Sequence, residues 1–351
     1  NTTASNNTAV GYQALYSGAT SSNNTAVGRQ ALYSMAYAGD GFNTAVGYTA
    51  GLNATTGYNL ALLGHRAGYS ITTGGNVVAI GSSALDANTT GSSNVGVGTN
   101  ALGANTTGGS NSALGDSALA ANTTASYNTS VGYKAAYANT IGAALTAIGA
   151  QSLMTNTSGG YNTALGNNTL RLNTTGNYNV ALGMYALDAN TTASNNTAVG
   201  YQAGYSNTTG AQNTFIGQGA GDSNTTGSNN TALGRTSLGA NTTGGSNVAL
   251  GRDALYSNTT ASNNVAVGFR AGYSNTAGTY LVAVGYDAAL ENTTGNYNTV
   301  VGRKALEYNT TASYNTAMGT EALRYNTTGA QNVGIGAFAL QSNTTASNNV
   351  A

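Results

Sequence analysis

A short period dominates the sequence and constrains the fold more than any other feature. A glycine closes each N-T-A-V-G run or a close variant of it, from Gly11 to Gly336, and 20 such glycines define 19 intervals. Eighteen of these intervals share one 17-residue length, and only the one from Gly28 to Gly47 is longer, by two positions. A fixed short period is typical of solenoids, in which each repeat packs against its neighbours.

We number the repeat from the Asn of N-T-A-V-G as position 1, so that the glycine is position 5. Position 4 is aliphatic in every copy, as in Val10, Leu182 and Met318, whereas position 2 is usually Thr or Val and position 3 is usually Ala. Such residues favour strands, and alternate residues of a strand share a face. The pattern predicts a strand with position 4 directed into the coil and positions 3 and 5 on the outer face.

The rest of the repeat is also more compatible with strands than with helices. A small residue at position 8 and Leu, Gly or Ala at position 9 predict a second short strand, and the abundant Gly, Asn, Thr and Ser disfavour helix. A 17-residue coil, at about 3.3 Å per residue, has room for two or three short strands and tight corners. We therefore expect an all-β chain, a parallel β-solenoid with about 20 coils and one 17-residue repeat per coil.

The repeat replaces the usual division of a chain of this length into domains. Residues 1–351 are predicted to form a single continuous repeat region, which we expect to be a segment of a longer fibre protein because it starts and stops within a repeat. The only change of length is a two-residue insertion in the segment 35–42 (MAYAGDGF). We expect a surface loop there, which either accommodates the insertion or forms a local binding protrusion.

Composition excludes several classes of function. The chain has 50 Gly but no Pro, as expected where nearly every backbone amide donates to a ladder. Ten basic and ten acidic residues give no net charge, which argues against a nucleic-acid partner. No apolar run approaches the roughly 20 residues that span a bilayer. The absence of Cys excludes disulfides, thiol catalysis and Cys-based zinc sites.

From Asn88 onward, position 12 is Asn in every copy and is followed by Thr. The members of this column are Asn88, Asn105, Asn122, Asn139, Asn156, Asn173, Asn190, Asn207, Asn224, Asn241, Asn258, Asn275, Asn292, Asn309, Asn326 and Asn343. Stacked one coil apart, these amides can donate and accept along the axis, so we predict an Asn ladder at a corner whose left-handed conformation Asn tolerates. Position 1 forms a second Asn column, interrupted at Leu60, Val77, Leu145 and Leu281.

The Asn-Thr-Thr triplets also match the acceptor sequence for N-glycosylation. Asn88, Asn105, Asn207 and Asn224 are therefore candidate glycosylation sites. The ladder explains the same triplets without any sugar, so the sequence leaves both interpretations open.

Charged residues are confined to three columns. Positions 6, 7 and 10 hold 18 of the 20 charges, and we expect these columns to face solvent. A charge ladder of alternating sign is predicted at position 7 over five successive coils: Asp253, Arg270, Asp287, Lys304 and Glu321. Exposed ion pairs contribute only about 0.2–1 kcal/mol each, so the ladder should act mainly on register. The like-charged neighbours Arg235 and Arg252 at position 6 do not fit this pattern.

Tyrosines also recur by column. The repeated pairs and triplets are Tyr16 with Tyr33, Tyr256 with Tyr273, and Tyr280 with Tyr297 and Tyr314. Aromatic contact between neighbouring coils explains them. The functional alternative is an adhesive strip that contacts carbohydrate.

Nothing in the sequence forms a catalytic constellation. His65 is the only histidine, so one chain cannot assemble a His-based metal cluster or a Ser-His-Asp triad. The acids are dispersed over the coils and mostly alternate with bases. We predict no catalytic, cofactor-binding or metal-binding residues, no cofactor and no enzyme activity.

The runs at Asn76–Gly81 (N-V-V-A-I-G) and Asn264–Gly268 resemble the head repeats of trimeric autotransporter adhesins. Similar repeats also occur in long phage tail fibres, and the resemblance covers the whole chain. It implies a left-handed parallel β-roll, three chains side by side and a role in attachment at a cell or virion surface. The coil here departs from that family by an added N-T-T-x-x corner.

The leading hypothesis is a non-enzymatic extracellular structural fibre or stalk that binds other copies of itself, as a trimer, and a host surface or an extracellular carbohydrate or protein. Leu62, Phe215 and Val300 at position 3 independently favour association, because an outer face would leave them in water. One alternative is an end-to-end filament of single solenoids. Another is an ice-binding solenoid, in which Thr columns such as Thr208, Thr225 and Thr242 order water.

Overall fold

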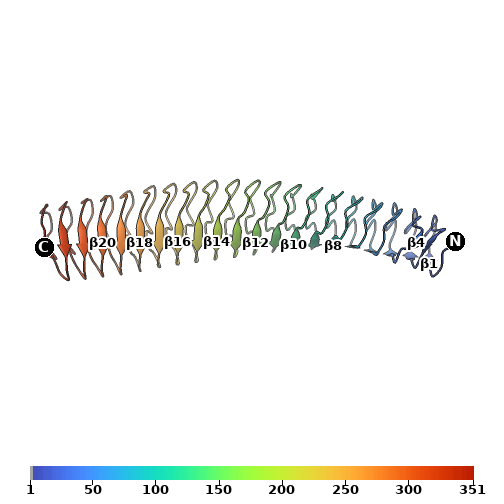
Figure 1. Ribbon diagram of the computed structural model, residues 1–351, viewed down its shortest axis with the longest axis horizontal. Coiled ribbons are helices and arrows are strands. Elements are labelled where there is room, and N and C mark those ends of the chain that lie inside the picture. Colours follow the sequence, from blue (N-terminus) through green and yellow to red (C-terminus); the bar gives the residue numbers. More distant parts are fainter. Residues whose placement is uncertain (1–2) are drawn as a thin grey trace. The chain divides into compact units, whose positions relative to one another are not determined.

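The chain forms a parallel β-solenoid with a 17-residue repeat, as expected. The computed structural model describes residues 3–351, which contain strands and turns and no helix that could cross a membrane. Two compact units divide the chain: unit 1 ends at Asn177, and unit 2 comprises Tyr178–Ala351. In each unit every coil contributes one short strand that lies beside the equivalent strand of the next coil (Figure 1).

The strands of the repeat are short, and two further short strands pair with each other, one of them within the insertion. Unit 1 contains β1 (Thr8–Val10), β2 (Ser21–Ser22), β3 (Thr25–Val27), β4 (Gly39–Asp40), β5 (Thr44–Val46), β6 (Leu60–Leu63), β7 (Val77–Ile80), β8 (Val95–Val97), β9 (Ser112–Leu114), β10 (Thr129–Val131), β11 (Thr146–Ile148) and β12 (Thr163–Leu165). Unit 2 contains β13 (Val180–Leu182), β14 (Thr197–Val199), β15 (Thr214–Ile216), β16 (Thr231–Leu233), β17 (Val248–Leu250), β18 (Val265–Val267), β19 (Val282–Val284), β20 (Thr299–Val301), β21 (Thr316–Met318) and β22 (Val333–Ile335).

Neighbouring coils pair in parallel with a shift of one repeat. Ala249 of β17, for example, lies opposite Ala266 of β18. Outside the strands the backbone continues the same pattern, since Thr225 N donates to Thr242 O at 2.9 Å and Gly221 N donates to Ser237 O at 2.9 Å. Every position of the repeat therefore becomes a column of stacked neighbours.

The interior of the coil lies on the opposite side of the strand from the one predicted. Position 3 is buried in the strands from β3 to β22, as at Ala181 and Ala266, and is exposed at Ala9 of the terminal strand β1, whereas no described position-4 residue is buried and Leu233 is 47% exposed. At Gly96, which lacks a side chain at position 3, a Cβ would lie 3.3 Å from Leu85 at position 9 of the preceding coil. Because the position-9 leucines fill the narrow interior, the strand has room for a methyl group there, and the predicted inward position 4 is wrong.

The apolar interior keeps its volume while its residues change. Seven coils have a small residue instead of Leu at position 9: Gly51, Gly68, Ala136, Gly204, Gly221, Gly272 and Ala289. Larger side chains fill the space: a Cβ on Gly204 would lie 2.7 Å from Phe215 Cδ2, and one on Gly272 would lie 3.1 Å from Leu281 Cδ2. Leu62, Phe215 and Val300 are buried for this reason, as close packing requires, and not placed on an outer face.

The corners are left-handed and mostly lack glycine. Positions 7, 9 and 17 have positive φ in every described coil, as at Gln30 (57°), Leu32 (50°) and Asn23 (59°). Such a conformation costs roughly 1–2 kcal/mol for an L-residue, and the neighbouring coils hold it in place, since Leu32 N donates to Ala50 O at 3.0 Å. Left-handed residues at both positions 7 and 9 preclude extended backbone, so the predicted second strand is wrong.

Glycine is required at position 5 because successive copies stack directly on each other. Gly251 has φ 132°, and a Cβ on it would lie 2.5 Å from the carbonyl oxygen of Gly268 in the next coil. No L-residue with a side chain fits there, which accounts for the column from which the repeat was first recognised.

The insertion in segment 35–42 is absorbed at the surface of unit 1. It contributes the short strand β4, whose Asp40 lies opposite Ser22 of β2 and accepts a hydrogen bond from Asn23 Nδ2 at 2.7 Å. Met35 is fully buried where the segment begins. The insertion thus pairs with the preceding coil.

Candidate functional site

Two rows of Asn line one side of the interior, and the predicted ladder is confirmed. At position 12, Asn122 Nδ2 donates to Asn105 Oδ1 at 2.8 Å and to the carbonyl oxygen of Ala125 at 3.0 Å. At position 1, Asn111 Nδ2 donates to the same carbonyl oxygen at 2.9 Å. The predicted ladder residues are all buried in these rows: Asn88, Asn105, Asn122 and Asn173 in unit 1, and Asn190, Asn207, Asn224 and Asn241 in unit 2.

The second row also completes the backbone ladder. Asn94 Oδ1 accepts the backbone N–H of Asn111 at 3.0 Å, so a side chain replaces the carbonyl that the left-handed residue at position 17 has turned away. Where Leu145 interrupts the row, its own N–H still donates to Asn128 Oδ1 at 2.9 Å. The ladder residues at position 12 do not themselves have positive φ, so the expectation that they adopt the left-handed conformation is wrong.

The candidate glycosylation sites coincide with the buried ladder. Asn88, Asn105, Asn207 and Asn224 are fully buried, and Nδ2 of Asn207, for example, donates to Asn190 Oδ1 at 3.0 Å and to Gly210 O at 2.9 Å. A glycan on that nitrogen would remove a hydrogen bond and open the corner. Modification at any of these four sites is therefore incompatible with the ladder at that coil.

Among the position-7 charges of unit 2, one pair of neighbouring residues in the column is joined directly. The other charges pair with residues at positions 6 and 10. Arg270 binds Asp287 through two hydrogen bonds of 2.9 Å, whereas Asp253 pairs with Arg252 at 3.0 Å. Lys304 pairs with Glu307 at 3.1 Å. Of the four successive pairs in the column, only Arg270 and Asp287 are joined directly among the described residues. The charges therefore link positions 6, 7 and 10 across the surface, which explains how Arg252 is tolerated beside Arg235.

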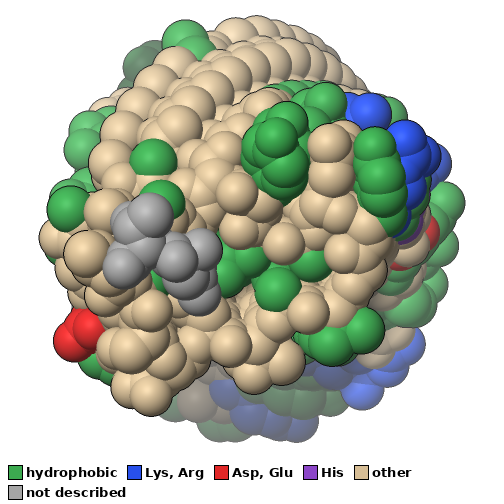
Figure 2. Space-filling view, turned by 90° about the vertical axis from the view of Figure 1, so that its right-hand side faces the viewer, with side chains coloured by type: hydrophobic (Ala, Val, Ile, Leu, Met, Phe, Trp, Pro, Cys, Tyr) green, Lys and Arg blue, Asp and Glu red, His purple; other side chains and the backbone are tan. Residues whose placement is uncertain are grey.

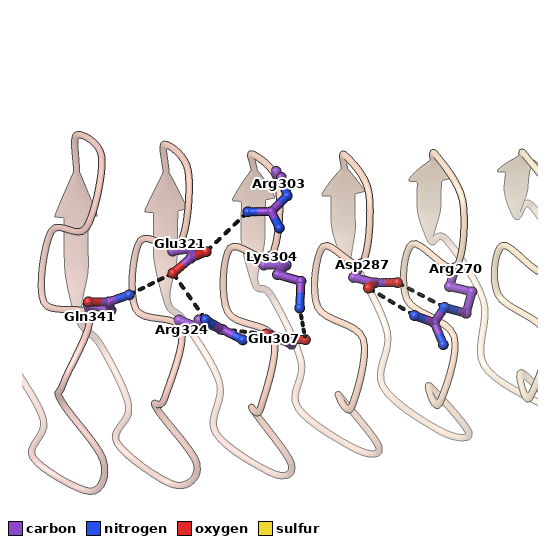
Figure 3. A network of polar contacts seen from close by, with 8 residues as sticks. All are labelled: Arg270, Asp287, Arg303, Lys304, Glu307, Glu321, Arg324 and Gln341. Carbon is purple, nitrogen blue, oxygen red and sulfur yellow. Dashed lines mark hydrogen bonds and ion pairs between the residues drawn. The ribbon is translucent and has the colours of Figure 1, made fainter.

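A branched network joins three coils of unit 2 (Figure 3). Glu321 accepts hydrogen bonds from Arg303 and Arg324, both at 3.1 Å, and Arg324 also donates to Glu307 at 2.6 Å. Glu307 and Asp287 are only 3% and 1% exposed, so the expectation that positions 7 and 10 face solvent is wrong for them. The long Arg and Lys side chains cover the carboxylates.

Hydrogen bonds, neighbouring charges and burial shift the pKa values of several of these charged groups. The hydrogen bond to Asp287 raises the pKa of Arg270, and that to Glu307 raises the pKa of Arg324. Desolvation favours neutral Glu321, but the hydrogen bonds and charges of Arg324 and Arg303 together outweigh it and lower its pKa. Asp222 lacks such partners: desolvation raises its pKa, and hydrogen bonds from Ser223 offset this only in part.

Aromatic columns stack face to face along several corners. The ring centroids of Tyr280 and Tyr297 are 4.8 Å apart with an interplanar angle of 5°, and those of Tyr297 and Tyr314 are 5.1 Å apart at 8°. At position 6, Arg29 lies between the rings of Tyr12 and Tyr48, 5.8 and 5.5 Å from their centroids. Rings that cover each other's faces offer a sugar only their edges, so stacking on carbohydrate is disfavoured within the column.

The outward residues of the strands form an apolar surface. We call the position-4 residues of each unit the aliphatic stripe; its most exposed members are Val10, Leu63, Leu114, Leu165, Leu182, Leu233, Met318 and Ile335. Position 2 flanks it, mostly with Thr and Val, and none of its residues is buried. In the end view, hydrophobic side chains lie on the surface among polar ones, with Lys and Arg at the upper right and at the bottom (Figure 2). A continuous apolar stripe is more than the isolated apolar residues of an ordinary surface.

The two Thr columns differ in exposure and in the use of their hydroxyls. At position 13, Thr208 and Thr225 use their hydroxyls internally, and Thr225 Oγ1 donates to Thr242 O at 3.0 Å. At position 14, Thr209 and Thr226 are exposed. The residues named from the sequence as water-ordering are thus in the inner column, and the exposed column is its neighbour.

The described residues of each unit form no pocket, and they contain no group of three or more His, Asp or Glu placed to hold a metal ion. The features that remain are surfaces and ladders. The sequence indicated the columns of Asn, Tyr and charged residues, but it did not indicate that position 4 faces outward. No model of a known protein family matches the chain, and comparison with the curated proteins finds no match.

Proposed function

We propose that the chain is a non-enzymatic structural segment of an extracellular fibre or stalk whose copies associate side by side. The observation that supports this best is the aliphatic stripe, which places one outward aliphatic residue on every coil of each unit while the interior is already filled. Exposed apolar surface of this regularity favours a partner that removes it from water.

The partner that fits the stripe is a second copy of the same chain. The stripe repeats once per coil, at the roughly 4.8 Å spacing of neighbouring strands, and an identical chain in axial register presents the same spacing. On the position-2 side the stripe is flanked mostly by Thr and Val, without the charges that would oppose apolar contact. On the other side, beyond the glycine at position 5, position 6 carries charges such as Arg235, Arg252 and Arg303, which would lie at the rim of the contact. The resemblance to trimeric adhesin heads favours three copies, and attachment would then fall to the charged and aromatic columns at positions 6, 7 and 10.

Native mass spectrometry of the whole chain tests this proposal. We expect a mass of three chains, and a single-chain mass for the variant with Leu182→Asp, Leu233→Asp and Met318→Asp, which places charges in the stripe. The matched control places Asp on the same three coils at position 14 (Thr192→Asp, Thr243→Asp and Thr328→Asp) and should remain trimeric. A wild-type chain that is monomeric at all concentrations would refute side-by-side association.

A second candidate is binding to ice, which the exposed position-14 column favours. Thr209, Thr226 and Thr243 are exposed at a spacing of one coil, next to the position-13 column. Thermal hysteresis of the same variants discriminates the two functions. An ice-binding surface would lose activity in the position-14 variant and keep it in the stripe variant, the reverse of what association requires.

A further inference from the structure

Tyr280, Tyr297 and Tyr314 form a column of three phenols at position 17 of successive coils in unit 2. Their rings are stacked at 4.8 and 5.1 Å between centroids and are nearly parallel. Each side chain remains accessible, with exposed fractions of 49%, 48% and 57%. The column therefore combines close contact between rings with access for a reagent in solution.

The backbone fixes this arrangement. All three residues are left-handed, with φ of 55°, 55° and 62°. Tyr297 N donates to Thr279 O at 3.0 Å, and Tyr314 N donates to Asn296 O at 3.0 Å, so each corner is tied to the preceding coil. The backbone of neighbouring coils thus holds the three tyrosines one repeat apart in the same orientation of the main chain.

The geometry points to a site of oxidative cross-linking between neighbouring coils: we propose that Tyr297 couples to Tyr280 or Tyr314 to form a dityrosine. A one-electron oxidant, such as a haem peroxidase with hydrogen peroxide, takes one electron and one proton from each of two phenols. The two phenoxyl radicals then form one carbon–carbon bond between ring carbons ortho to the hydroxyls. Two ring protons move to the phenolic oxygens, and one hydrogen peroxide is reduced to two waters for each link.

The link would close a loop of one repeat. It would join two coils that are otherwise held by hydrogen bonds and stacking, and it would restrict the unfolded chain as any closed loop does. This proposal goes beyond the structural role above and does not depend on it, because the ring geometry lies within one unit of one chain.

Tyrosines elsewhere in the chain provide matched controls. Tyr127 occupies the same position of the repeat and is 73% exposed, but Ser110 and Ala144 take its place on the coils before and after it. Tyr185 and Tyr205 are close but perpendicular, with centroids 6.1 Å apart and an interplanar angle of 87°. If stacking directs coupling, neither arrangement should give the product formed in the column.

The test treats the whole chain with horseradish-type peroxidase and limiting hydrogen peroxide, then measures dityrosine fluorescence and maps cross-linked peptides. We expect linked peptides joining Tyr297 to Tyr280 or Tyr314, at a yield independent of protein concentration. Tyr297→Phe should abolish both links, Tyr280→Phe should leave the Tyr297–Tyr314 link, and Tyr127→Phe should change nothing. Treatment in urea should reduce the column's yield to that of Tyr127.

Three outcomes would overturn the proposal. They are links that form only between chains and rise with concentration, a yield in the column no greater than at Tyr127, and a yield that survives unfolding. Amide hydrogen exchange of β19 and β20 in the Tyr280→Phe and Tyr297→Phe variants verifies that the coils remain folded. If only Tyr297→Phe disturbs the coils, Tyr280→Phe still tests the proposal. In that variant the cross-link should join Tyr297 to Tyr314.

Discussion

The two sides of the coil interior tolerate sequence change differently. On the apolar side, positions 3 and 9 range from Gly to Phe, and a small residue in one place is compensated by a large neighbour, as with Gly204 and Phe215. On the amide side, position 12 is Asn in every coil from Asn88 to Asn343. Apolar burial is non-directional and depends on volume, whereas a buried amide needs particular partners.

The first coils of unit 1 show that the amides are not needed to form the corner. Position 12 there holds Met35, Ala54 and Ile71, and position 1 holds Leu60 and Val77, which lie opposite each other in strands β6 and β7. The backbone bonds are the same on both sides of the change: Thr72 N donates to Thr89 O and Thr89 N donates to Thr106 O, both at 2.9 Å. The Asn rows therefore add register specificity to a corner that apolar residues can also fill.

Removing the largest apolar side chain should have the largest effect. We expect Phe215→Ala to destabilise its coils by about 3–5 kcal/mol, because it leaves a cavity between two glycines. Gly221→Leu should also destabilise on its own, since Phe215 occupies that space, but it should restore much of the loss when added to Phe215→Ala. Local opening free energies from hydrogen exchange of β15 measure both terms, and additive effects would contradict volume compensation.

Substitution of an Asn in the ladder should destabilise the fold more than substitution of an apolar residue at the same position of the repeat. Asn122→Leu leaves Asn105 Oδ1 without its donor, and we expect a loss of about 2–3 kcal/mol from the buried unsatisfied group. Ile71→Leu changes only shape at the same position of the repeat and should cost less than about 1.5 kcal/mol. Urea denaturation monitored at the affected coils compares them. Equal losses would mean that the amide row contributes volume and not hydrogen bonding.

The smallest predicted effects concern two surface carboxyls with opposite pKa shifts. Because burial raises the pKa of Asp222, its contribution to stability is complete below the unfolded-state pKa and is lost as pH rises through the folded-state value. Asp222→Asn should therefore stabilise the fold at neutral pH, by less than about 1 kcal/mol.

Glu321 provides the control of opposite sign. Its pKa is lowered, so its contribution is present above the unfolded-state pKa and is lost as pH falls through the folded-state value. Glu321→Gln should destabilise at neutral pH and have no effect in acid. Melting temperatures of both variants between acid and neutral pH test the pair; parallel pH profiles would show that the two environments do not differ as described.

The period determined what could be predicted. It led to the fold class, the stacked columns and the Asn ladder, because a parallel solenoid places equivalent residues in contact. It did not reveal which face of the strand is buried, since position 4 is more hydrophobic than position 3. The missing signal was in the sequence, because in every such coil except that of Gly221 a small residue at position 9 is followed by a large one at position 1 or 3 of the next coil. Examples are Gly51 with Leu62, Gly204 with Phe215, and Gly272 with Leu281. At Gly221 the ring of Phe215 fills the space instead.

Other features could not be read from residue types. Leu at position 9 adopts a left-handed conformation because bonds to neighbouring coils override its own preference, as at Leu32. Asp287 and Glu307 are buried because Arg270 and Arg324 cover them, which depends on side-chain direction more than on column. Intercoil contacts, and not local propensity, decide both cases.

Position 3 faces the interior of the coil and position 4 faces outward, and one comparison of variants tests this directly. Hydrogen exchange of strand β16 (Thr231–Leu233) should be measured in Ala232→Asp and Leu233→Asp. We predict that Ala232→Asp abolishes amide protection in β16, because it buries an unpaired charge, while Leu233→Asp retains that protection. The opposite result, with protection lost in Leu233→Asp and kept in Ala232→Asp, would contradict the account.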